Sequence, residues 1–321
     1  MSCNENPYKL HGISSLQDNT LIPTVEENLK SFFDYGLLHI GGFINVNIPT
    51  SGLYKTTFHT LKPSKDPSYV ANTVWQTPKK DWIWESGISY NNTQPINISG
   101  IKIANTFYPA PSGSGTIEFR LDYENGQVIF NKAINSSSKV EMNYSYRWCQ
   151  IIKSNHNMWQ TLQTMTYQPN PQISQADKGD YSISASHRLQ LPAIVIETIP
   201  RNSNTPYELG SLVSYRQQDI LCHIYAENIN DCNILMDILR LQKDKTILLY
   251  DLKKVINNNF YGLNNNGSKN NNGLNYGQIV SNPNLTWNRL YIKDVNFLDI
   301  QKNTSSSMVW CITRLTVEVI V

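Results

Sequence analysis

Residues 191–252 constrain the fold of this chain more than any other stretch. They read LPAIVIETIP, a polar turn-rich segment, QQDILCHIYAEN, INDCNILMDILRLQ and KDKTILLYDL. Short apolar runs bounded by turn residues indicate strands, and apolar residues that recur at helical spacing indicate a helix. The stretch therefore predicts a strand, a loop, a second strand, a helix and a further strand in that order.

The first strand, residues 193–199, is apolar on both faces, so we expect it to lie inside a sheet. Residues 201–210 contain proline and glycine and are predicted to form a loop. Residues 212–215 and 219–226 follow as two strands or as one long strand. Asn230 or Asp231 is the expected N-cap of the helix over residues 230–242. Its predicted apolar stripe consists of Ile234, Leu235, Ile238 and Leu239.

Three further elements extend this core. Near the N-terminus, Val25, Leu29, Phe32, Phe33 and Leu37 recur at helical spacing. Thr24 and Glu27 fit a capping box at the start of that helix, and Gly36 favours an end near that residue. Residues 290–300 and 308–321 are predicted strands, and the second alternates Cys311, Thr313, Leu315, Val317 and Val319 with residues of the other face.

Residues 53–150 are predicted to be almost entirely β. The clearest hairpin is TIEFRLDYENGQVIF, in which Asn125-Gly126 predicts a type I′ turn. A further strand is expected over residues 140–148. Regularly spaced short strands indicate a sandwich or small barrel. The predicted fold is α+β: residues 1–52 with 151–321 form a mixed sheet with one or two covering helices, and residues 53–150 form a large sandwich-like all-β insertion.

Composition narrows the function. The net charge is +2 and no Lys/Arg run occurs, so specific nucleic-acid binding is not expected. The five cysteines include no CxxC pair, which favours reduced buried thiols over a zinc site or a disulfide framework. No signal peptide or membrane-spanning segment is recognised. We therefore expect a protein that is made in the cytoplasm and does not span a membrane.

No catalytic, phosphate-binding or metal motif occurs, so we expect no enzyme activity, no cofactor and no metal. Cys222 and His223 are adjacent in a predicted strand and must point to opposite faces, which excludes a nucleophile pair. Asp122 and Glu124 flank a turn and are expected to face water.

Two features are candidates for interactions. Trp82 and Trp84, with Tyr144, Tyr146 and Trp148, could form a sugar-stacking surface, or they could be the core or an interface of the β-domain. The Asn/Gly-rich segment 257–277 reads in isolation as a disordered or mobile loop, and it could instead contact a partner. The candidate interface residues are Arg201, Asn202, Tyr207, Phe260, Tyr261, Trp82 and Trp84.

Residues 214–251, SYRQQDILCHIYAENINDCNILMDILRLQKDKTILLYD, resemble the α/β unit of tail-terminator and neck proteins of tailed bacteriophages. In that class a long strand precedes an amphipathic helix that covers one face of a sheet, and further strands follow. FRLDYENGQVIF and VEMNYSYRW are similar to β-rich segments of phage virion proteins. The likeness covers about half the chain. Segment 53–150 is larger than any part of the minimal terminator fold, which leaves neck, tail-completion and baseplate positions open.

The resemblance implies a non-enzymatic structural protein that is made in the host cytoplasm and resides in the virion. The first hypothesis is a neck or tail-terminator ring protein that caps the tail tube and joins it to the connector. It would form a sixfold or twelvefold homo-oligomeric ring and contact the tail tube, sheath and connector. The alternative is a baseplate or receptor- or carbohydrate-binding tail protein, with the β-domain as its binding head.

Overall fold

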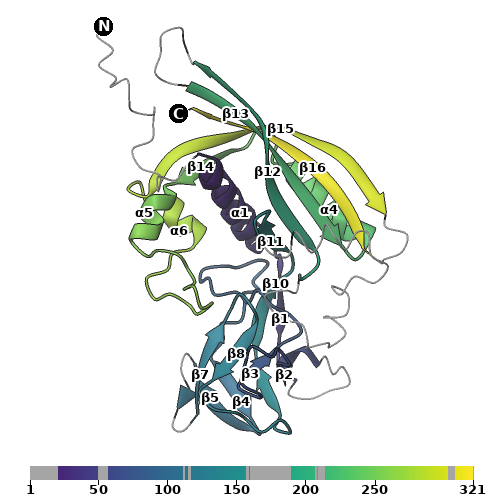
Figure 1. The fold of residues 1–321 in the computed structure, drawn as a ribbon, viewed down its shortest axis with the longest axis vertical. Coiled ribbons are helices and arrows are strands. Elements are labelled where there is room, and N and C mark those ends of the chain that lie inside the picture. The colour runs from purple at the N-terminus through teal and green to yellow at the C-terminus, as the bar shows by residue number, and fades with distance from the viewer. Residues whose placement is uncertain are drawn as a thin grey trace.

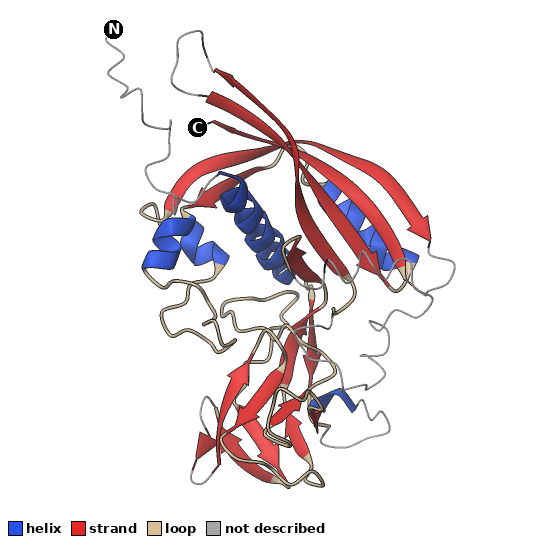
Figure 2. Ribbon diagram, in the orientation of Figure 1, coloured by secondary structure: helices blue, strands red, loops and turns tan. Residues whose placement is uncertain are grey.

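The computed structural model describes residues 21–49, 57–110, 113–114, 117–156, 159, 189–206, 208, 214–302 and 308–320. These residues form two bodies, an α+β body built on a six-stranded sheet and a body built on an eight-stranded sheet (Figure 1). The longer helices lie in the first body, and the second consists mainly of strands and loops (Figure 2). The predicted α+β class with a sandwich-like β-rich part is confirmed.

The six-stranded sheet runs in the order β11, β12, β13, β16, β15, β14. These strands are β11 (Gln150–Lys153), β12 (Ala193–Pro206), β13 (Ser214–Ala226), β14 (Thr246–Tyr250), β15 (Thr286–Lys302) and β16 (Val309–Ile320). β11 and β12 pair in parallel and the other neighbours pair antiparallel, so the sheet is mixed, as predicted.

Two helices, α1 (Leu21–His39) and α4 (Ile229–Arg240), pack on the same face of this sheet, which arches over them in Figure 1. Alternate strand residues point to that face and meet the apolar stripes of both helices in one core. Two short helices, α5 (Leu252–Asn257) and α6 (Tyr276–Val280), pack beside β14 in a smaller apolar cluster.

α1 begins at Leu21, three residues before its predicted cap Thr24, which is buried within the helix. Pro23 is tolerated because the backbone amides in the first turn of a helix make no hydrogen bond within the helix. The helix also continues past Gly36, where a side chain would meet open space. The predicted core stripe is otherwise confirmed for Val25, Leu29, Phe33 and Leu37.

The N-cap of α4 is Asn228, so the predicted caps Asn230 and Asp231 are wrong. The Asn228 side-chain oxygen accepts a hydrogen bond from the Asp231 amide at 2.9 Å. Asp231 lies in the first turn, where its charge interacts favourably with the helix dipole. The predicted stripe is also wrong in part, because Ile234 is 48% exposed. The buried stripe consists of Cys232, Leu235, Met236 and Leu239.

β12 is longer than predicted, because β13 keeps pairing with it as far as Pro206↔Ser214. The predicted loop over residues 201–210 is therefore wrong for residues 201–206, which are strand. Residues 207 and 209–213 lie outside the described part of the chain. β12 continues past Pro200, since a strand at a sheet edge needs no amide hydrogen on its outer side. β13 is one continuous strand, the second of the two predicted alternatives.

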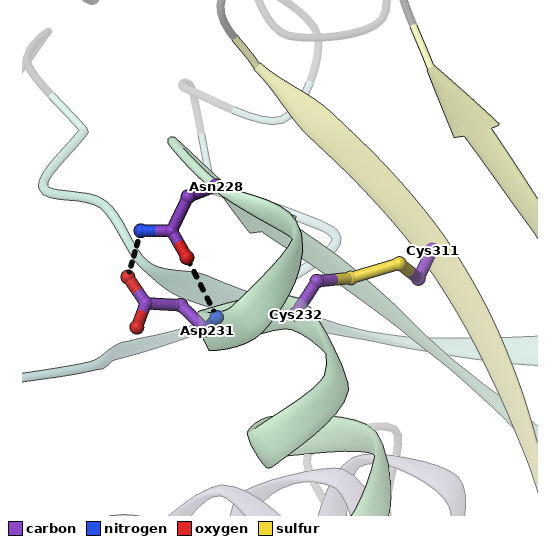
Figure 3. Close-up of a disulfide and its surroundings, with 4 residues drawn as sticks. All are labelled: Asn228, Asp231, Cys232 and Cys311. Atoms are coloured by element: carbon purple, nitrogen blue, oxygen red, sulfur yellow. Dashed lines mark hydrogen bonds between the residues drawn. A yellow bond between two sulfur atoms is a disulfide. The ribbon is translucent and has the colours of Figure 1, made fainter.

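Cys232 of α4 and Cys311 of β16 form a disulfide (Figure 3). The expectation of reduced thiols is wrong for this pair, whereas Cys149 and Cys222 are free and buried, as expected. The bonded cysteines are 79 residues apart in sequence, so no spacing motif could reveal them. Their pairing depends on the packing of α4 over β16.

The second body, here called the barrel, has the strand order β5, β4, β9, β2, β3, β8, β7, β6. The strands are β2 (Thr60–Pro63), β3 (Val74–Gln76), β4 (Gly100–Ile103), β5 (Thr106–Pro109), β6 (Gly113–Ser114), β7 (Ile117–Asp122), β8 (Gln127–Phe130) and β9 (Val140–Met142), and one turn of 3₁₀ helix covers Thr57–His59. The two ends of this sheet, β5 and β6, contact each other. The interior is filled by apolar and aromatic side chains.

The predicted hairpin β7–β8 is present, but its turn is not type I′. Gly126 has a φ of 65°, whereas Asn125 does not have a positive φ. Asp122 pairs with Gln127, and its carboxylate accepts hydrogen bonds from the amide and the side chain of Asn125, each at 3.0 Å. Asp122 is therefore buried rather than facing water, and burial raises the pKa of its carboxyl.

The predicted strand 140–148 is two strands. β9 belongs to the barrel, whereas β10 (Tyr144–Arg147) pairs with β1 (Phe43–Val46) as a separate antiparallel ribbon. Figure 1 shows β1 and β10 between the two bodies. The chain thus leaves the α+β body and returns to it along one two-stranded ribbon.

Candidate interaction surfaces

The end of β12 has an open outer edge. β11 pairs with β12 only as far as Ile196, whereas β13 accompanies β12 to Pro206. No strand of the described chain covers the outer edge beyond that point, and residues 203–206 are exposed. We call residues 199–206 with 214–218 the arm. Figure 1 shows it extending past the helices.

The open edge of the arm is protected against unlimited strand addition. Pro200 and Pro206 carry no amide hydrogen, and a register shift lies between Thr198 and Asn202. Both features are ways in which proteins blunt exposed strand edges. Of the interface residues predicted here, Arg201 and Asn202 lie in the arm, and Tyr207 lies outside the described residues.

A second exposed surface lies on α4 and β15, on the other side of the sheet order from the arm. A salt bridge between Lys243 and Asp294 at 3.3 Å and a hydrogen bond from the Asp244 amide to the Ile292 carbonyl at 2.8 Å tie the end of α4 to β15. The exposed apolar side chains are Ile234 (48%), Leu241 (79%), Phe297 (43%) and Leu298 (50%). The sequence did not reveal this surface, because helical spacing predicts Ile234 in the core.

The outer edge of β14, in contrast, is occupied by side chains of its own chain. Asn28 is fully buried, and its amide group accepts from the Tyr250 amide at 2.8 Å and donates to the Tyr250 carbonyl at 3.2 Å. The Tyr276 hydroxyl donates to the Leu248 carbonyl at 3.1 Å. The only sequence signal for this role was a polar residue within the apolar side of α1.

Trp82 and Trp84 do not form an exposed platform. Trp82 is 0% exposed in the barrel core, and its Nε1 donates to Thr77 Oγ1 at 3.2 Å. Trp84 packs against the barrel core and against Gly262. Sugar stacking requires an exposed ring face. The core alternative therefore describes Trp82, Tyr144 and Tyr146, and Trp84 packs against the same core. Trp148 instead packs against the core of the α+β body.

The Asn/Gly-rich segment is folded, contrary to the expectation of a disordered or mobile loop. The Asn270 side chain donates to the carbonyls of Asn259 and Tyr261, both at 2.8 Å, and accepts from the Asn272 amide at 3.0 Å. Asparagine side chains can replace backbone partners in turns, which explains how this composition holds a fixed shape. α6 then starts at a capping box formed by Asn275 and Gln278.

Phe260 and Tyr261, which were predicted to reach a neighbouring subunit, have contacts within their own chain. Both pack against the cluster beneath α5 and α6. Burial raises the pKa of the Tyr261 hydroxyl. Contact of either residue with a neighbour stays a prediction.

Buried charges meet where the two bodies join. Arg147, at the end of β10, is 7% exposed, and its guanidinium donates to Asp34 of α1 at 2.7 Å and to Glu85 of the second body. Burial raises the pKa of Asp81 to about 6 and also raises the pKa of Glu85. A buried ion pair is costly to break, so this cluster fixes α1 against the second body.

Cys222 and His223 point to opposite faces of β13, as predicted. Cys222 lies in the core under the helices, where burial raises the pKa of its thiol to about 12. His223 Nε2 lies 2.7 Å from Glu197 Oε2 on the other face, and its ring centroid lies 4.5 Å from that of Trp159. Burial lowers the pKa of His223. The two residues therefore cannot act together on one substrate.

Across the described part of the chain, no group of His, Cys, Asp and Glu side chains could hold a metal ion. Among those same residues, no helix has the length and apolar character needed to cross a bilayer. No protein-family model and no curated protein sequence matches this chain.

Proposed function

We propose that this protein is a non-enzymatic structural component of a tailed-phage virion that forms a ring at the head–tail neck and caps the tail tube. The arm is the observation that carries this proposal. It offers an exposed strand end whose edge is limited by two prolines and a register shift. Such an edge allows one limited contact and opposes unlimited strand addition. A head-to-tail contact of this kind gives a ring when the rotation between subunits closes.

The α4–β15 surface supports the same proposal. A ring is built from head-to-tail contacts, so each subunit needs two different complementary surfaces. The arm is mainly polar, whereas the second surface presents four exposed apolar side chains on the opposite side of the sheet order. Interfaces commonly combine an apolar centre with a polar rim.

The native mass of the purified full-length chain tests the proposal. We expect one discrete assembly of six or twelve copies by light scattering and electron microscopy. Thr205→Arg, which places a charge on the exposed arm, is expected to release monomers. The matched control is Ser136→Arg on an exposed barrel loop, which should leave the assembly intact. A wild-type chain that stays monomeric at high concentration would contradict ring formation.

Particles made without this protein test its position in the virion. A neck role predicts full heads and separate tails. Normally joined particles would contradict it, and joined particles that fail to adsorb would favour the baseplate alternative. Trp82 is buried and Trp84 is partly buried against the barrel core and Gly262, so this pair gives that alternative no exposed stacking platform.

A further inference from the structure

Residues 258–275 leave the α+β body and contact the second body, and we call them the strap. Three hydrogen bonds mark the contact. The Tyr123 amide donates to the Gly267 carbonyl at 2.9 Å, and the Arg120 guanidinium donates to the Asn266 carbonyl. The Asn275 side chain donates to the Ser86 carbonyl at 3.4 Å.

Glycine occupies two of the closest approaches between the strap and the second body. A Cβ at Gly262 would overlap the Trp84 ring. Gly267 has a φ of 75°, and a Cβ there would overlap the Asp122 carboxylate. The strap therefore fits its site closely, because no other residue type could take either position without displacing a neighbour.

The strap keeps its shape through its own hydrogen bonds. Besides the contacts of Asn270, the Asn264 amide donates to the Ser268 carbonyl at 2.8 Å and the Gly267 amide donates to the Asn264 carbonyl at 2.8 Å. Its contact with the second body is small, because it consists of the three hydrogen bonds, of Leu263 against the barrel core and of the Trp84 ring against Gly262. Segments with few buried apolar contacts open at a low free energy.

The strap is one of several contacts between the two bodies. The β1–β10 ribbon and the Arg147 cluster join them, Leu38 of α1 packs with Ile83 and Ile88 in a buried apolar cluster, and the Lys80 amide donates to the Gln190 side chain at 2.9 Å. The strap contacts the β7–β8 turn and the Trp84 loop at other points of the second body. Opening of the strap therefore leaves the two bodies joined.

We propose that the strap is a latch. It detaches from the second body as a unit while both cores stay folded, and its release removes one of the contacts between the two bodies. This inference does not depend on the proposed ring.

Hydrogen exchange of the full chain tests the latch, because the Tyr123 amide is bonded to the strap. The Phe130 amide, which donates to the Thr73 carbonyl at 2.8 Å within the barrel, is the internal reference. We expect Tyr123 to exchange at least about tenfold faster than Phe130, as a local opening does. Equal rates with the same denaturant dependence would show that the strap opens only when the barrel unfolds, which would overturn the proposal.

Gly262→Ala and Gly267→Ala are each expected to speed Tyr123 exchange by a further factor of about ten while Phe130 is unchanged. The matched control is Gly36→Ala, at a position with no heavy atom within 4 Å, which should alter neither rate. Loss of protection at both amides, or no change at Tyr123, would overturn the latch.

Discussion

Arg147 is a single residue on which the joint between the two bodies depends. Arg147→Met leaves the carboxylates of Asp34 and Glu85 next to each other without their cation. We expect the free energy of unfolding to fall by about 3–5 kcal/mol, the usual effect of removing one partner of a buried pair. Urea unfolding at neutral pH measures it. Adding Asp34→Asn and Glu85→Gln should recover much of the loss. An Arg147→Met variant as stable as wild type would contradict the role assigned to the cluster.

Asp81 is expected to make stability fall with rising pH. Burial raises its pKa from 3.8 to about 6, so between these values the folded state holds a proton that the unfolded state has lost. The contribution of Asp81 to stability therefore decreases as pH rises through this window. Asp81 has a φ of 54°, which Asn tolerates, so Asp81→Asn is a close replacement.

The free energies of unfolding of Asp81→Asn and wild type are compared at pH values from about 4 to about 8, a range that spans the raised pKa. The variant should gain relative to wild type as pH rises to about 6 and keep that advantage above it. A difference that does not vary with pH would contradict the raised pKa.

At the residue scale, sequence reasoning succeeded where strand alternation decides orientation. Cys222 and His223 lie on opposite faces for that reason alone. It failed where a polar residue is buried by a distant partner. Nothing local to Asn28 shows that its side chain meets Tyr250, which lies 222 residues away.

Among the elements, β14 depends on α1 for its outer edge. Asn28→Ala leaves the Tyr250 amide and carbonyl without these partners in a buried site. At about 1–3 kcal/mol for each of the two unsatisfied groups, we expect a loss of about 2–6 kcal/mol. The control is Asn233→Ala on the exposed side of α4, which makes the same helix-favouring change. Equal effects of the two substitutions in thermal unfolding would contradict the edge contact.

The disulfide holds α4 against β16. Digestion without reduction is expected to release Cys232 and Cys311 in linked peptides. Reduction, or the double variant Cys232→Ala/Cys311→Ala, is expected to lower the free energy of unfolding by about 2–4 kcal/mol, since the bond closes a long loop. The double variant should no longer respond to reductant. The protein is also digested after alkylation at cell lysis and after isolation from released particles. If the two cysteine peptides are unlinked in both samples, the bond is contradicted.

The limits of sequence reasoning at the element scale have a common cause. Helices and strands were found wherever apolar periodicity is strong, as in α1, β13 and β16. Their ends were misplaced where a partner decides them. β12 continues through a proline because β13 lies beside it, and the buried stripe of α4 is set by contact with β13 and β16.

For the whole molecule, the sequence predicted two parts of different character but not how they are joined. Turn spacing and alternation depend on near neighbours, so a β-rich segment within an α+β chain could be recognised. Strand order, the β1–β10 ribbon and the docking of the strap are contacts between distant residues. For the same reason the candidate interaction surfaces of the structure differ from those that the sequence predicted. Trp82 and Trp84 are in or against the barrel core, whereas the α4–β15 surface was not foreseen.

The paired residues Val46 and Tyr144 make the β-insertion testable by excision. Replacing residues 47–143 with Asn-Gly joins β1 to β10 as a two-residue hairpin in their existing register. We expect the α+β body to stay folded and to unfold cooperatively, because its main core takes no side chain from the excised segment. Leu38→Lys and Leu263→Ser would replace two apolar side chains that the excision uncovers.

The excised chain also separates the two bodies as sources of assembly. If the arm and the α4–β15 surface form the ring, the excised chain should assemble with the copy number of the full chain, because both surfaces lie outside the excised residues. If the full chain assembles but the excised chain is a folded monomer, the contact is instead assigned to the β-insertion. A chain without a cooperative transition would show that residues 47–143 are part of one folding unit with the α+β body, joined through the strap and the Arg147 cluster.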